Sequence, residues 1–113
     1  MDGNLMGRLM ETFVVAQIRG ELASASANIR AYHLRDANGR HEIDLLLEYP
    51  GRGIVGLEVK TAATADAKDA KHLAWLRDEL GDSFLRGVVL YTGPRPRELG
   101  EKLIAAPIAA IWQ

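Results

Sequence analysis

Two stretches decide the fold of this chain: HEIDLLL at residues 41–47 and IVGLEVK at residues 54–60. Both predict β-strands, because aliphatic and β-branched residues dominate them. The turn sequence PGRG at residues 50–53 lies between them. Two strands joined by so short a connection are expected to pair as an antiparallel hairpin.

Three charged side chains interrupt these apolar stretches. Side chains alternate between the two faces of a strand, so Glu58 and Lys60 share one face, opposite to their aliphatic neighbours Leu57 and Val59. Asp44 lies inside a run that should otherwise be buried, where an unpaired carboxylate costs several kcal/mol. We therefore expect a cation beside Asp44.

The remaining segments predict one compact α/β domain with the order helix, three-strand meander, helix, strand and short strand. Apolar residues recur at helical spacing in two segments, and turn residues bound the others. The expected elements are a helix over residues 3–22, strands over 29–35, 41–48 and 54–60, a helix over 68–80 closed by Gly81, a strand over 84–91 and a short edge strand over 103–106.

The composition is that of an ordinary globular domain, with 113 residues, 48% of them hydrophobic and 26% charged. There is no cysteine, which excludes disulfides and thiolate metal sites but leaves room for a metal held by oxygen ligands. No apolar run approaches the roughly 20 residues that span a bilayer, and no signal peptide opens the chain, so we expect a cytoplasmic protein without membrane contact. The net charge of −1 predicts weak nucleic-acid binding by this domain alone.

The acids and the lysine on the paired strands suit metal-assisted hydrolysis. Asp44 and Glu58 together could hold Mg²⁺ or Mn²⁺, which prefer oxygen ligands. Lys60 could orient or deprotonate an attacking water, or stabilise a charged transition state. Glu11 is a candidate fourth member, since it lies on a mostly apolar face of the first predicted helix. An acid at the wet edge of that helix is an equally good interpretation of Glu11.

At these residues the chain resembles the PD-(D/E)XK nuclease-like superfamily, in which a helix carries a Glu and a three-strand meander carries an Asp and a Glu-x-Lys. It is most similar to one branch, an uncharacterised C-terminal domain found behind an AAA-type ATPase module in bacterial and archaeal proteins. The segments that carry the resemblance are LMETFV (9–14), LRD (34–36), HEID (41–44), LEVKTA (57–62), GVVLYTG (87–93) and PIAAIW (107–112).

The resemblance implies a restriction-endonuclease-like core, a central mixed sheet of four to five strands flanked by helices. It assigns metal binding to Asp44 and Glu58 and the catalytic lysine role to Lys60, with Glu11 less uniform among the branches. No Gly-x-x-x-x-Gly-Lys-Ser/Thr phosphate loop occurs. We therefore expect residues 1–113 to be one nuclease-like domain, either the C-terminal part of a longer ATPase or a shortened standalone copy.

Two functions from different classes follow from these observations. The first is a magnesium-dependent nuclease acting on DNA or RNA. The alternative is a non-catalytic binding or regulatory domain that retains the nuclease fold, with an ATPase module or a second copy of the chain as its partner.

Simpler structural roles are open for the same residues. Glu58 and Lys60 could be solvent-facing neighbours at a strand end, and Asp44 could pair with Arg35 or Arg40 across the hairpin. The three histidines, His33, His41 and His72, show no metal-ligand spacing and are expected to be structural or exposed.

Overall fold

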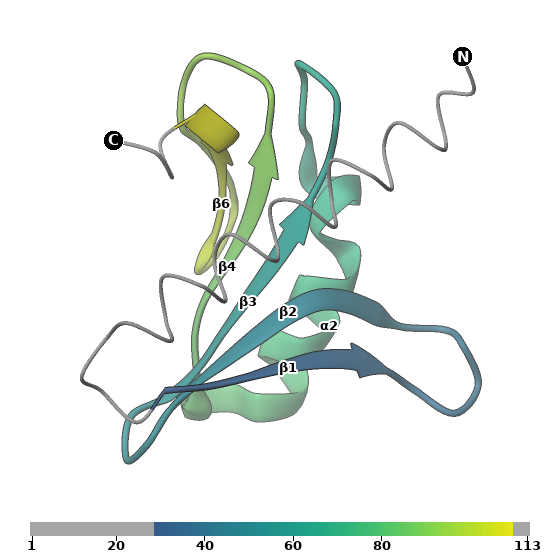
Figure 1. The fold of residues 1–113 in the computed structure, drawn as a ribbon, viewed down its shortest axis with the longest axis vertical. Helices are drawn as coiled ribbons and strands as arrows, with labels where there is room; N and C mark the ends of the chain where they lie inside the picture. Colours follow the sequence, from purple (N-terminus) through teal and green to yellow (C-terminus); the bar gives the residue numbers. More distant parts are fainter. Residues whose placement is uncertain (1–28, 110–113) are drawn as a thin grey trace.

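The computed structural model describes residues 29–109, and its central feature is a mixed β-sheet with one α-helix packed against it (Figure 1). The α/β class is confirmed, but the sheet has six strands rather than the expected four to five. The first predicted helix, with Glu11, lies outside the described residues. The described elements are β1 (Arg30–Arg35), β2 (Glu42–Tyr49), β3 (Gly53–Val59), the 3₁₀ turn η1 (Ala67–Ala70), α2 (Lys71–Leu80), the 3₁₀ turn η2 (Gly81–Ser83), β4 (Phe84–Tyr91), β5 (Arg97–Gly100) and β6 (Leu103–Pro107).

The strand order across the sheet is β1-β2-β3-β4-β6-β5. Strands β1 to β3 form the predicted antiparallel meander, and β4 joins β3 in parallel after the crossover through α2. The predicted edge position of β6 is wrong, because β6 lies between β4 and β5. Strand β5 was not expected from the sequence, because it is short, polar and exposed for most of its length and so lacks a strand pattern.

Helix α2 packs closely on β3 and β4 because both strands carry a glycine under it. Leu73 of α2 is fully buried. A Cβ atom added at Gly56 would lie 2.6 Å from Leu73 Cδ2, and one added at Gly87 would lie 3.1 Å from Leu73 Cβ. These glycines therefore set how near the helix comes to the sheet. In the described part of the chain no helix is long and apolar enough to cross a membrane.

The two faces of the sheet carry separate apolar clusters. On the α2 side, Ile43, Leu73, Phe84 and Val89 belong to the main core. A second cluster contains Leu90 and Ile108, with Leu57 and Val59 packed against them, as the predicted alternation along β3 requires. Glu58 and Lys60 accordingly lie on the α2 side of the sheet. The residues that join the main core cluster are Ile43, Leu46, Ala70, Leu73, Leu76, Phe84, Val89 and Leu103.

A β-bulge in β2 lies at the predicted site residue Asp44. Tyr32 of β1 pairs with Leu46, whereas Leu34 pairs with Ile43, so Asp44 and Leu45 together lie opposite one residue of β1. The extra residue explains how Ile43 and Leu46, three positions apart, both enter the core under α2. A bulge bends its strand and redirects the side chain at that point. In β2 the residue at this point is the acid Asp44.

Candidate functional site

A cleft of about 450 Å³ opens between the sheet and the start of α2. Strands β2 and β3 contribute Asp44 and Glu58, because Leu45 pairs with Leu57 and the two acids follow at the same end of this strand pair. The opposite wall comes from η1 and the first turn of α2. The lining residues are Glu42, Asp44, Glu58, Val59, Lys60, Lys68, Asp69, Lys71, His72 and Val89.

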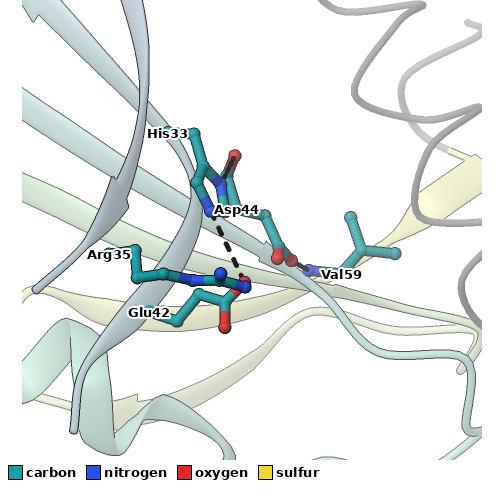
Figure 2. A network of polar contacts seen from close by, with 5 residues as sticks. All are labelled: His33, Arg35, Glu42, Asp44 and Val59. Carbon is teal, nitrogen blue, oxygen red and sulfur yellow. Dashed lines mark hydrogen bonds and ion pairs between the residues drawn. The ribbon is translucent and has the colours of Figure 1, made fainter. Parts of the chain in front are cut away.

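The Asp44 carboxylate is oriented by the backbone of β3. Its Oδ2 accepts a hydrogen bond of 2.8 Å from the Val59 N–H, and Figure 2 shows the side chain directed at that group. The cation predicted beside Asp44 is thus not a neighbouring arginine. The Nη2 atom of Arg35 lies 3.4 Å from Oε1 of Glu42 instead. A backbone N–H satisfies one carboxylate oxygen and leaves the other available for a ligand.

Lys60 reaches across the cleft from the end of β3 to η1. Its Nζ donates a hydrogen bond of 2.7 Å to Oδ2 of Asp69, and its backbone N–H donates to the Leu90 carbonyl. The Lys60 side chain is 35% exposed and that of Asp69 21%. The interpretation of Glu58 and Lys60 as solvent-facing neighbours is therefore wrong for Lys60, which is half-buried and paired with a residue nine positions away.

Asp69 is itself held by a capping box. The Asp66 N–H donates to Oδ2 of Asp69 over 2.8 Å, while Oδ1 of Asp66 accepts from the Lys68 N–H. Burial by itself would raise the pKa of Asp69. The hydrogen bonds from Lys60 and Asp66, together with the lysine charge, outweigh burial and lower that pKa below its ordinary value. Asp69 is therefore an ionised anchor for Lys60 at neutral pH.

The cleft thus collects three of the four predicted site residues. Asp44, Glu58 and Lys60 all line it, whereas Glu11 lies outside the described residues. Among residues 29–109 there is no group of three or more His, Asp or Glu side chains placed to hold a metal ion. Within residues 29–109, the two carboxylates predicted to bind a hard divalent ion in this cleft are Asp44 and Glu58.

The sequence from residue 6 to residue 111 matches the family model of a domain of unknown function, DUF4143. The chain belongs to the DUF4143 family. No curated protein matches it. Membership of an uncharacterised domain family is thus established over nearly the whole chain, and the family description assigns the DUF4143 domain no activity.

Two features of this DUF4143 domain were not expected from its sequence. The first is Asp69, for which a signal existed: DAKD at residues 66–69 has the spacing of a capping box and should have indicated a helix start. The second is the contact between His41 and His72, whose Nδ1 atoms lie 3.3 Å apart. No local signal could have found that pair, since 31 positions separate the residues.

We expect Asp69→Asn to make the free energy of unfolding of the DUF4143 domain depend less on pH in the acidic range. A carboxylate whose pKa is lowered by folding contributes stability above its unfolded pKa of about 4, and this contribution disappears as pH falls through the folded pKa. The variant should lose about 1 kcal/mol at pH 7, and the difference from the parent should shrink as pH falls below about 4. Urea unfolding at pH 7, 4 and 2 measures this. The matched control is Asp82→Asn, at an exposed position of η2.

Proposed function

We propose that this domain is a metal-dependent phosphodiesterase of the PD-(D/E)XK nuclease type, acting on nucleic acid. The observation that carries the proposal is that Asp44, Glu58 and Lys60 line one cleft. An Asp, a hairpin and a Glu-x-Lys are the elements of the superfamily that the sequence resembles. The bulge at Asp44 adds support, because bulges are over-represented next to active sites.

The donor set fits a hard divalent cation. Mg²⁺ is commonly bound through one or two protein carboxylates plus waters and substrate phosphates, rather than in a full protein cage. Asp44 and Glu58 would supply those carboxylates, with Asp44 already oriented by the Val59 N–H. When bound there, such an ion lowers the pKa of a water and neutralises charge on a phosphate oxygen.

Lys60 would supply the positive charge that the chemistry needs from the protein. Its ammonium group is held by Asp69 at the wall of the cleft that Asp44 and Glu58 also line. A phosphate oxygen entering the cleft would accept a hydrogen bond from Nζ in place of, or in addition to, Asp69. A preorganised donor of this kind stabilises developing charge in the transition state.

The second candidate function is a non-catalytic binding or regulatory domain of an AAA-type ATPase. One observation favours it: the Lys60 ammonium group is engaged in an ion pair with Asp69. The net charge of −1 also matches a domain that does not bind nucleic acid strongly by itself. Metal binding and cleavage distinguish the two candidates, since a purely regulatory domain needs neither.

Calorimetric titration with Mn²⁺ or Mg²⁺ tests the metal site. We expect one ion per chain, and Asp44→Asn should weaken its affinity at least about tenfold, equivalent to 1.4 kcal/mol. Without metal, the same variant should be at least as stable as the parent: asparagine can still accept from the Val59 N–H, and any repulsion between the two acids is removed.

Glu42→Gln is the matched control, because Glu42 lines the same cleft but contacts Arg35 and His33. Equal metal affinity in the parent and Asp44→Asn would rule out the proposed carboxylate pair. Metal binding without cleavage of single-stranded DNA, duplex DNA or RNA would favour the regulatory function.

A further inference from the structure

Two histidines from distant parts of the chain meet beside the cleft. His41 immediately precedes β2, and His72 is in the first turn of α2. Their Nδ1 atoms are 3.3 Å apart, and the two rings meet edge to face at 85°. Both side chains are half-buried, and His72 lines the cleft.

Both imidazoles are held in place by neighbouring elements. The His41 ring stacks on the Trp75 indole with a centroid separation of 3.9 Å and an angle of 7°. The His41 carbonyl accepts a hydrogen bond from the Asp36 N–H, which closes the loop before β2. His72 is held by α2, one helical turn before Trp75. The pair is therefore fixed from both sides, by the loop and by the helix.

The separation of the two nitrogens matches that of neighbouring ligands on a tetrahedral metal ion. With zinc–nitrogen bonds of about 2.0–2.1 Å, adjacent ligand atoms are about 3.3–3.4 Å apart. We propose that His41 and His72 form a two-imidazole site for a divalent transition-metal ion such as Zn²⁺, Ni²⁺ or Cu²⁺. Each imidazole would ligate through the Nδ1 lone pair, with its proton on Nε2.

This site is chemically distinct from the carboxylate pair of the proposed function and does not depend on it. Imidazole suits Zn²⁺, Cu²⁺ and Ni²⁺, whereas Mg²⁺ takes oxygen ligands. A metal ion requires the neutral form of each imidazole. Since no described group of three ligands surrounds the pair, water would complete the coordination, and the ion would be exchangeable rather than structural.

The stacked indole makes binding directly measurable. The chain has two tryptophans, so a Trp112→Phe background leaves Trp75 as the sole indole emitter. A Cu²⁺ ion on His41 would lie close to Trp75 and quench its fluorescence. We expect saturable quenching by Cu²⁺, its reversal by excess Zn²⁺, and no response to Mg²⁺.

Matched variants separate metal ligation from a hydrogen bond between the rings. His72→Gln can still hydrogen-bond to His41 but removes an imidazole, and should shift the quenching midpoint at least tenfold to higher Cu²⁺. His33→Gln changes the chain's remaining histidine, which lies on β1, and should leave the quenching midpoint unchanged. Asp44→Asn should also leave the quenching midpoint unchanged. An unshifted midpoint in His72→Gln, or an equal shift in His33→Gln, would overturn the proposal.

A measurement on the natural sequence guards against variants that fold poorly. Zn²⁺ added to ¹⁵N-labelled protein should shift the Nδ1 resonances of His41 and His72 together, and leave those of His33 in place. Unchanged Nδ1 resonances at saturating Zn²⁺ would overturn the site. Neither outcome bears on whether Asp44 and Glu58 bind Mg²⁺, so the two proposals fail separately.

Discussion

Lys60→Ala is expected to lower the rate of metal-dependent phosphodiester cleavage at least about 100-fold while leaving metal affinity nearly unchanged. A charged lysine has no lone pair to offer a cation, so its contribution lies in the transition state. The Nζ atom is already held at the wall of the cleft by Asp69, which means that little ordering remains to be done on substrate binding. Cleavage of a plasmid with Mn²⁺, followed over time, measures the rate.

Lys68→Ala is the matched control for Lys60→Ala. Lys68 lines the same cleft and carries the same charge, but its side chain is exposed at η1. Its loss should cost much less activity. Asp44→Asn should be as inactive as Lys60→Ala, so activity that persists equally in both variants marks a contaminating nuclease. Wild-type rates in purified Lys60→Ala, alongside an inactive Asp44→Asn, would exclude the catalytic role of the lysine.

Asp69 also has to be considered in interpreting Lys60→Ala. Removing the ammonium leaves the Asp69 carboxylate with its hydrogen bond from the Asp66 N–H, so η1 retains part of its cap. A loss of fold in Lys60→Ala would therefore be unexpected. Circular dichroism and the urea midpoint of the variant separate a loss of activity from a loss of structure.

Leu73→Ala should destabilise the domain by about 2–5 kcal/mol, a large share of the roughly 5–15 kcal/mol that holds a domain of this size together. Leu73 is fully buried and fills the space that Gly56 and Gly87 leave under α2. Truncating it leaves a cavity at the contact between helix and sheet, where the backbone is already as close as the glycines allow. Urea unfolding, with the m-value monitored, measures the loss.

The control for Leu73→Ala is the same change at Leu85, which is 37% exposed on β4. Leu85→Ala should lose far less stability, because fewer packing contacts and less apolar area are at stake. A urea midpoint of Leu73→Ala close to that of the parent would show that α2 is not held by this contact. Since α2 and η1 carry His72 and Asp69, a loosened helix should also weaken the Lys60 anchor.

The main strands and the helix could be predicted because their signals are local. Each of these elements is predicted by its own residues. Strands β2 and β3 have apolar runs, β4 is a continuous apolar stretch, and the apolar residues around Leu73 have helical spacing. The turn at residues 50–53 also determines that β2 and β3 are antiparallel neighbours. That pairing brings Asp44 and Glu58 to the same end of two strands, so most of the candidate site was predictable.

The order of the last strands was decided by the tertiary structure. Strand β6 is apolar enough to take an inner position in the sheet, and the polar strand β5 then covers its outer edge. Nothing in a segment of four mostly exposed residues signals a strand, because its conformation depends on pairing with β6. The bulge at Asp44 has the same origin, since it appears only when β2 is paired with β1.

The contacts of the charged and aromatic side chains at the site likewise could not be predicted from the sequence. The pattern at residues 54–60 determined that Lys60 projects from the Glu58 face of β3, but the packing of η1 decided that Asp69 receives its ammonium group. The same docking of α2 on the sheet brings His72 to His41 across 31 positions. Local periodicity decides which face a side chain occupies; what it meets there depends on contacts between distant segments, which form only when the whole core packs.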